Sequence, residues 1–126
     1  MKKLLFVILL FFGCTGQIKN YHIPDCSLEK DYNTKYCESV NGIAEYRLPD
    51  NTICDCLTEE FAIEVDFAEK WYEAVGQSLH YALITGQKAK IVLIIENNFD
   101  YVYLDRLQAV IRENDLKISV ETVTNN

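Results

Sequence analysis

The chain has 126 residues and a formal net charge of -7 at pH 7. This length allows a single hydrophobic core and predicts one folded domain. The acidic balance argues against a protein that attracts nucleic acid through a broad basic surface, because that kind of binding depends on clustered Lys and Arg. A protein of this charge that acts on nucleic acid would need bound cations to offset the local negative charge.

The first 16 residues predict a targeting segment. Lys2 and Lys3 give it a positively charged start, and Leu4 to Phe12 form a nine-residue apolar run. Such a run is too short to cross a bilayer as an ordinary helix, and the pattern is typical of a signal peptide. The chain is therefore expected to be exported from the cytoplasm. Without the two lysines, residues 17–126 form a single domain whose net charge is -9, two below the -7 of the whole chain.

Two processing sites fit the end of this segment. Gly13-Cys14 resembles the end of a bacterial lipobox, in which Cys14 would carry the lipid. Cys14-Thr15-Gly16 resembles a small-x-small cleavage site that leaves Gln17 as the new N-terminus. A retained membrane anchor is a third alternative. The protein is thus expected to be a membrane-anchored lipoprotein, a periplasmic protein or a secreted protein, and a lipid on Cys14 would be the membrane contact of the first.

The domain that follows carries an even number of cysteines, at positions Cys26, Cys37, Cys54 and Cys56. In an exported domain this count permits disulfides, and four cysteines allow three connectivities. Cys54 and Cys56 lie two apart on a predicted strand, so both are expected on the face opposite Asp55. Core packing or a structural disulfide is the favoured interpretation over a redox pair. A zinc site is disfavoured because His22 and His80 are isolated.

The hydrophobic patterns predict helices and strands in alternation. In chain order they are an irregular lead-in at 17–26, a helix at 27–40, strands at 43–48, 52–57 and 61–67, a helix at 68–84, a strand at 91–95, a helix at 101–113 and a strand at 117–123. The first three strands predict an antiparallel meander, and the strands that flank the second helix predict a parallel pair. The expected fold class is α/β: a mixed sheet with an αβββαβ core and an extra C-terminal helix and strand.

Acidic residues gather on one face of the predicted meander. Strand 61–67 alternates, which puts Glu64 and Asp66 opposite its hydrophobic side chains. A three-residue turn at 49–51 would pair Glu45 with Asp55, and a four-residue turn at 58–61 would pair Asp55 with Glu64. Like charges on neighbouring strands repel unless a cation lies between them. We therefore predict a Mg²⁺ or Mn²⁺ site whose ligands are Glu45, Asp55, Glu64 and Asp66.

The predicted helix at 68–84 adds a polar row beside these carboxylates. Its members fall at i, i+3, i+7 and i+10, and they are Lys70, Glu73, Gln77 and His80. Because the acidic strand leads directly into this helix, Lys70 is expected to reach back toward the carboxylates. The alternative is a solvated charged face with an ion pair between Lys70 and Glu73.

These residues resemble the signature of the PD-(D/E)XK nuclease superfamily, which includes type II restriction enzymes and archaeal Holliday-junction resolvases. The core of that family is a helix, a three-stranded meander, a second helix and a parallel strand, and the resemblance covers about residues 30–96. Asp55 matches the Asp of the family signature, and Glu64-Val65-Asp66 matches its Glu-x-Lys. Gln77 matches a position on the following helix that often carries Gln or Lys.

The resemblance has one open position and one departure. The additional acid, which the family takes from the preceding helix or strand, is matched by Glu45 or less favourably by Glu38. Asp66 stands where the family has its lysine, which is thought to position or deprotonate the attacking water. Lys70 could supply that ammonium group from the helix instead.

The function that the resemblance implies is metal-dependent hydrolysis of nucleic-acid phosphodiesters. A water activated by Mg²⁺ or Mn²⁺ would attack the phosphorus. The catalytic residues would be Asp55, Glu64, Lys70 and Gln77, where Lys70 orients the water and Gln77 holds the substrate or a ligand. Two alternatives stay open: a catalytically inactive binding or interaction module on the same fold, and an exported interaction protein whose acidic face is plain surface.

Overall fold

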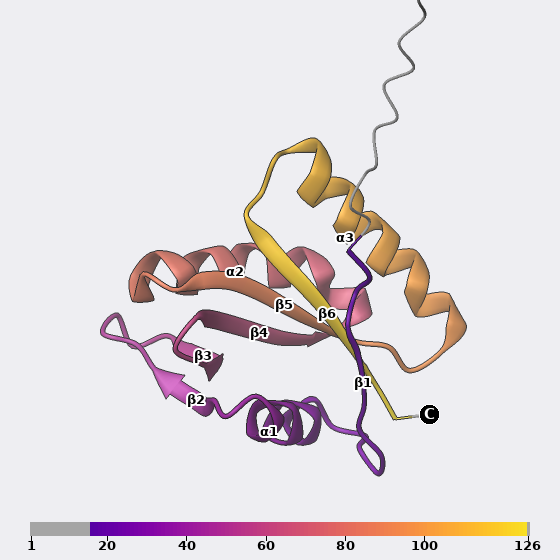
Figure 1. The fold of residues 1–126 in the computed structure, drawn as a ribbon, viewed down its shortest axis with the longest axis horizontal. Coiled ribbons are helices and arrows are strands. Elements are labelled where there is room, and N and C mark those ends of the chain that lie inside the picture. The colour runs from indigo at the N-terminus through magenta and orange to yellow at the C-terminus, as the bar shows by residue number, and fades with distance from the viewer. Residues whose placement is uncertain (1–15, 126) are drawn as a thin grey trace, which may run out of the picture.

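The computed structural model describes residues 16–125, and the predicted signal segment before Gly16 and the lipidation site Cys14 lie outside them. The described chain forms one mixed sheet with three α-helices (Figure 1). Its elements are β1 (Asn20–His22), α1 (Glu29–Ser39), β2 (Ile43–Arg47), β3 (Ile53–Leu57), β4 (Phe61–Phe67), a 3-10 turn at Ala68–Lys70, α2 (Trp71–Thr85), β5 (Lys88–Ile94), a 3-10 turn at Asn98–Asp100, α3 (Tyr101–Glu113) and β6 (Ile118–Thr124). No helix within residues 16–125 has the length and hydrophobicity needed to cross a membrane.

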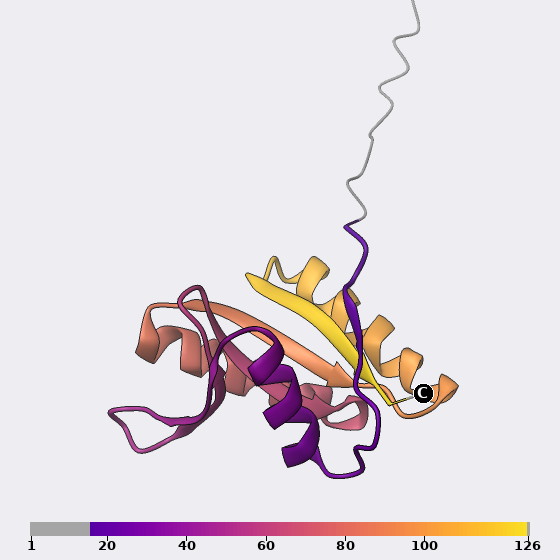
Figure 2. The same ribbon diagram turned by 60° about the horizontal axis from the view of Figure 1, so that its bottom comes forward.

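The sheet is covered on both faces. Its strand order is β1-β6-β5-β4-β3-β2, with α1 on one face and α2 and α3 on the other (Figure 1, Figure 2). Strand β5 shows why: Val92 and Ile94 join the core beneath α1, whereas Ile91 and Leu93 join the core beneath α2 and α3. A continuous apolar run is typical of a strand that is buried on both sides.

The predicted α/β class and mixed sheet are confirmed. Strands β2, β3 and β4 form the antiparallel meander, and β4 pairs in parallel with β5 across α2. The interpretation of residues 17–26 as irregular was incomplete, because β1 pairs in parallel with β6. This strand has only three residues, and the free edge of β6 holds it in place rather than any hydrophobic alternation of its own.

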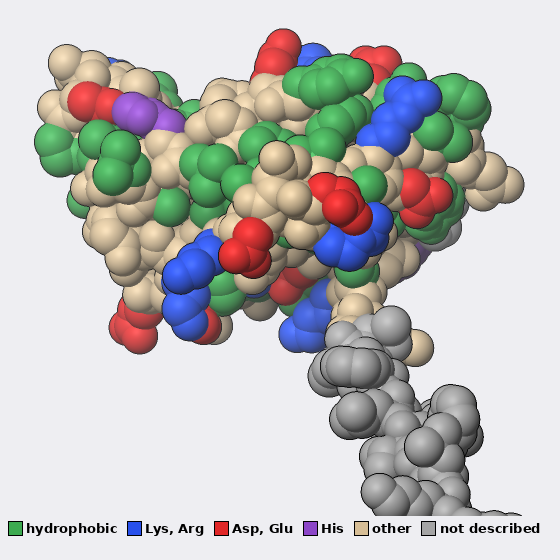
Figure 3. Space-filling view, turned by 90° about the horizontal axis from the view of Figure 1, so that it is seen from above, with side chains coloured by type: hydrophobic (Ala, Val, Ile, Leu, Met, Phe, Trp, Pro, Cys, Tyr) green, Lys and Arg blue, Asp and Glu red, His purple; other side chains and the backbone are tan. Residues whose placement is uncertain are grey.

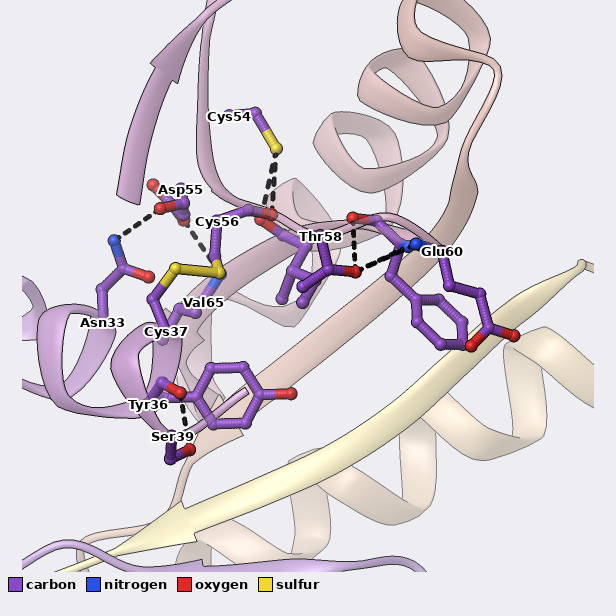
Figure 4. Close-up of a disulfide and its surroundings, with 12 residues drawn as sticks. Asn33, Tyr36, Cys37, Ser39, Cys54, Asp55, Cys56, Thr58, Glu60 and Val65 are labelled. Atoms are coloured by element: carbon purple, nitrogen blue, oxygen red, sulfur yellow. Dashed lines mark hydrogen bonds between the residues drawn. A yellow bond between two sulfur atoms is a disulfide. The ribbon is translucent and has the colours of Figure 1, made fainter. Parts of the chain in front are cut away.

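The four cysteines within residues 16–125 form one disulfide, between Cys37 on α1 and Cys56 on β3, while Cys26 and Cys54 are buried free thiols. The prediction that Cys54 and Cys56 share a face was wrong. Cys56 packs beneath α1, whereas Cys54 lies on the α2 side of the sheet (Figure 4). The reason is a distortion at Asp55 between them, where pairing with β2 is interrupted and regular pairing with β4 ends.

Gly42 lies directly against this disulfide. A Cβ atom there would be 2.4 Å from the sulfur of Cys56 and 2.8 Å from that of Cys37. We expect Gly42→Ala to lower the free energy of unfolding by about 1–3 kcal/mol through overpacking, as measured by urea denaturation of the oxidised protein. Gly76→Ala is the control, because a Cβ at that position in α2 meets open space and alanine favours a helix. Equal stability of the Gly42→Ala variant and wild type would contradict this close approach.

Candidate functional site

The ladder between β3 and β4 opens at Asp55. The pairs Leu57–Ala62 and Cys56–Ile63 follow the register predicted from the turn length, and this register places Asp55 beside Glu64. Beyond these two pairs, the amide of Val65 on β4 donates to a side chain of β3 and not to its backbone. The acceptor is Asp55 Oδ2, at 2.8 Å. The Asp55 carboxylate is therefore held between the two strands, beside Val65 (Figure 4), and it interacts with Glu64.

Helix α1 brings a further carboxyl group to this opening. Glu29, in the first turn of α1, approaches Asp66, and after burial it is the main cause that raises the pKa of Asp66. Lys70 Nζ lies 3.8 Å from Glu29 Oε2, so the ammonium group is at the edge of the same group of side chains. We call Glu29, Asp55, Glu64 and Asp66 the acidic cluster; its members come from α1, β3 and β4.

Burial, with repulsion between neighbouring carboxyl groups, raises the pKa of three members of the acidic cluster: Asp55, Glu64 and Asp66. Glu64 is 4% exposed, and burial, followed by the charge of Asp55, raises its pKa to about 10. Asp66 is 3% exposed, and burial together with Glu29 raises its pKa to about 8, although Lys70 opposes this shift. Burial also raises the pKa of Asp55, against the hydrogen bond from Val65. We therefore expect Glu64 and Asp66 to favour their protonated forms at neutral pH when no cation is bound.

The cluster also contains unused hydrogen-bonding capacity. Oε2 of Glu64 is buried and makes no hydrogen bond, and the same is true of Oδ1 of Asn33 on α1. The Asn33 side-chain amide donates to the backbone oxygen of Asp55 at 2.8 Å, so both unpaired oxygens lie next to Asp55. A buried acceptor without a donor or cation costs about 1–3 kcal/mol, which makes this a place where a ligand could bind favourably.

The raised pKa values of the acidic cluster predict an inverted dependence of stability on pH. Above pH 4.5 the unfolded chain has lost the protons of Glu64 and Asp66, whereas the metal-free folded chain keeps them until about pH 8 to 10. The folded state then binds more protons, so its stability falls as pH rises, by up to about 1.4 kcal/mol per pH unit for each carboxyl. Urea unfolding with a chelator at pH 5.5, 7.0 and 8.5 measures this slope. A stability that rises over that range would contradict the buried, protonated cluster.

Glu45 lies outside the acidic cluster. It is exposed, its φ angle is 50°, and the pairing of β2 with β3 is interrupted at the position where it would face Asp55. Its charge still raises the pKa of Asp55. Glu38 is exposed at the other end of α1, nine residues from Glu29 and thus about half a turn round the helix. The additional acid near Asp66 is therefore Glu29, which neither sequence candidate anticipated.

The predicted polar row begins at Lys70 in the 3-10 turn and continues along α2 with Gln77 and His80. Lys70 pairs with Glu29, and His80 Nε2 lies 2.6 Å from Asp50 Oδ2 in the turn between β2 and β3. Between them, the Gln77 side-chain amide donates to the hydroxyl of Tyr81 at 3.3 Å. Tyr81 is buried, and burial together with the charge of Glu64 raises its pKa to about 12. Gln77 thus contacts Tyr81, whose hydroxyl is near enough to Glu64 to be influenced by its charge, rather than the acidic cluster itself.

The donor atoms suit a hard divalent cation, since Mg²⁺ and Mn²⁺ prefer carboxylate oxygens. Within residues 16–125, however, no three His, Cys, Asp or Glu side chains are arranged so that they could already hold a metal ion. Binding would require Glu64 and Asp66 to lose their protons and turn their oxygens toward a common point. The unpaired Oε2 of Glu64 fits this requirement, because a cation would give it the partner that it lacks.

Sequence reasoning missed three residues that contact the predicted site: Glu29, Asn33 and Tyr81. Glu29, Asn33 and Cys37 follow one another at intervals of four residues on α1. This spacing already indicated that the three polar or reactive side chains share one face of the helix. Tyr81 lies four residues after Gln77, but its side chain points into the protein instead of joining the polar row. The buried face of α2 is instead formed by Trp71, Ala74, Ser78 and Tyr81.

Comparison with known proteins gives no match: no protein-family model, no curated protein and no solved structure is significantly similar to this chain.

Proposed function

We propose that the protein is an exported, metal-dependent nuclease of the PD-(D/E)XK type that hydrolyses nucleic-acid phosphodiesters. The observation that carries this proposal is the carboxyl group of Glu64, which is buried between two other acids and has one oxygen without a partner. Such an arrangement costs stability in the free protein. Binding of a cation would offset this cost and would explain why the buried carboxyl group is present.

The architecture supports the same proposal. The order α1-β2-β3-β4-α2-β5, with an antiparallel meander and then a parallel strand, is the order that the family resemblance implies. We further propose that this is a restriction-endonuclease-like core to which β1, α3 and β6 are added. In that core Asp55, Glu64 and Asp66 lie on the second and third strands of the meander, where the signature residues are expected.

The proposed reaction divides the work among named side chains. Asp55, Glu64 and Asp66 would hold Mg²⁺ or Mn²⁺, with Glu29 in the role first given to Glu45. The bound ion would lower the pKa of a water molecule and offset charge on the phosphoryl oxygens. Lys70, whose side chain is 47% exposed at the rim of the cluster, would orient that water. Gln77 would hold Tyr81 in place against Glu64 and contact the substrate.

Electrostatics suggests that substrate binding depends on the metal. On the face formed by α2 and α3, Lys and Arg side chains are interspersed with acidic and hydrophobic ones and do not gather in one area (Figure 3). With a net charge of -7 for the whole chain, long-range attraction to phosphates is weak. Affinity for nucleic acid is therefore expected to be low in a chelator and to rise when divalent ions are added.

Calorimetric titration of the purified protein with MnCl₂ and MgCl₂ tests the proposal, followed by incubation with plasmid DNA and with single-stranded RNA. We expect binding of at least one of the two ions and metal-dependent cleavage of one of the nucleic acids. The second candidate function is an inactive binding module on the same fold, and the observation that favours it is Asp66 at the position of the family lysine. Binding without cleavage selects that module, and absence of binding contradicts both.

A further inference from the structure

One row of side chains on α1 connects the disulfide to the acidic cluster. Glu29, Asn33 and Cys37 follow one another at intervals of four residues, so they share one face of the helix. Glu29 reaches Asp66, the Asn33 amide donates to the backbone oxygen of Asp55 at 2.8 Å, and Cys37 is bonded to Cys56. Figure 4 shows the last two contacts side by side, at Asp55 and at the residue that follows it.

Asp55 depends on these contacts because the sheet is irregular where it lies. Pairing of β3 with β2 is interrupted at Asp55, and the last regular pair of β3 with β4 is Cys56–Ile63. The Asp55 side chain itself bonds to the Val65 amide. Asn33 is 5% exposed, so its contact with Asp55 is shielded from water. Helix α1, fastened by the disulfide, therefore supplies the support that sheet hydrogen bonds do not give.

We propose that the Cys37–Cys56 disulfide assembles the acidic cluster, so that the metal site forms only after the chain has been oxidised. This inference rests on the proposed metal site. Oxidation removes two electrons and two protons from the two thiols and joins their sulfur atoms; an oxidant of the disulfide class takes up both and becomes a dithiol. Without that bond, α1 is held by the core packing of Tyr32 and Tyr36 but no longer fastened to β3, so Glu29 and Asn33 are positioned less firmly beside Asp55.

Because the disulfide is buried, we expect it to form before folding is complete and to resist reduction afterwards. Cys37 and Cys56 are 1% and 0% exposed, and they lie against Gly42 with no space between. Attack by a thiolate needs access to a sulfur atom, so the bond forms while the chain is still open and resists reductants once it has folded. A chain kept reduced before export would lack the assembled site, and the exported, oxidised chain would have it.

The test compares oxidised wild-type protein with the Cys37→Ala/Cys56→Ala double variant, through two measurements. Calorimetric titration with MnCl₂ is expected to show binding at least ten-fold weaker in the double variant. Hydrogen exchange of the Val65 amide, which bonds to Asp55, is expected to be at least ten-fold faster and needs no metal. Cys26→Ala removes a buried free thiol, and Leu107→Ala destabilises the core beneath α3. Both controls should leave the Mn²⁺ affinity within two-fold of wild type.

Each result decides one of the two claims. Unchanged Mn²⁺ affinity and unchanged Val65 exchange in a folded double variant overturn the role of the disulfide. If the double variant does not fold, Asn33→Ala keeps the disulfide and tests the same link; faster Val65 exchange supports it and unchanged exchange overturns it. If oxidised wild type binds no Mn²⁺, the proposed function fails, and Val65 exchange alone then decides whether the disulfide positions Asp55.

Discussion

Replacing Glu64 with glutamine is expected to raise the melting temperature of the metal-free protein at pH 8 and to abolish its response to divalent ions. In wild type, Glu64 is buried beside Asp55 and Asp66, which disfavour its charged form. An amide cannot ionise, so the variant avoids this cost, and it also removes the carboxylate that a cation needs. At 100 times its dissociation constant, a bound ion stabilises the native state by about 2.7 kcal/mol, and this gain should be lost.

Thermal unfolding in a chelator and in millimolar MnCl₂ measures both effects. Glu121→Gln is the matched control, because Glu121 is a half-buried glutamate that is already paired: it accepts hydrogen bonds from Lys90 at 3.1 Å and from Tyr36 at 2.5 Å. That variant should lose stability and keep its response to Mn²⁺. If Glu64→Gln is destabilised in the chelator while its Mn²⁺ response is intact, Glu64 is not the strained ligand that we propose.

Replacing Lys70 with alanine is expected to reduce metal-dependent cleavage by at least about 100-fold, the usual lower range for loss of a group that assists proton transfer. Its metal affinity should change little, because the ammonium group lies at the rim of the acidic cluster, 3.8 Å from Glu29. The measurement is initial cleavage rate at saturating Mn²⁺, together with calorimetric Mn²⁺ affinity. Adding Asp66→Lys to this variant would return an ammonium group to the strand position of the family and should recover part of the rate.

Lys88→Ala is the control for this experiment. Lys88 is also an exposed lysine that pairs with a glutamate, at 3.2 Å from Glu60. It lies at the start of β5, beside Phe61 and therefore at the end of β4 that is far from Lys70. Its removal should leave cleavage unchanged. Equal rates for Lys70→Ala and wild type would show that the ammonium group has not moved from strand to helix.

The meander could be predicted because its short turns allow few registers between neighbouring strands. The turns of the meander fix its register, and strict alternation in β4 fixes the face of Glu64 and Asp66. The same rules failed beside Asp55, where a side chain takes a hydrogen bond that the backbone would normally take. The rule that side chains alternate between the two faces holds only for a regular strand. It therefore put Cys54 on the wrong face of the sheet and included Glu45 among the metal ligands.

The contributions of α1 to the site could not be predicted from local pattern. Where Glu29 and Asn33 lie is set by how α1 approaches the sheet, and α1 is joined to β3 by a disulfide between residues that are 19 apart in sequence. Three connectivities were possible for the four cysteines, and nothing in their spacing distinguishes them. Strand β1 shows the same limit, since its partner β6 lies at the far end of the chain.

The irregular backbone at Glu45 has a consequence for how the molecules behave toward one another. Strand β2 is an outer strand, and all five of its residues are exposed, including Ile43 at 59% and Tyr46 at 40%. An open edge of this kind invites another chain to add a strand, which begins aggregation. The left-handed backbone of Glu45 interrupts the edge at its middle, and its charge repels a second copy. Glu45, which lies outside the acidic cluster, thus makes this edge a poorer template for the addition of a strand from another chain.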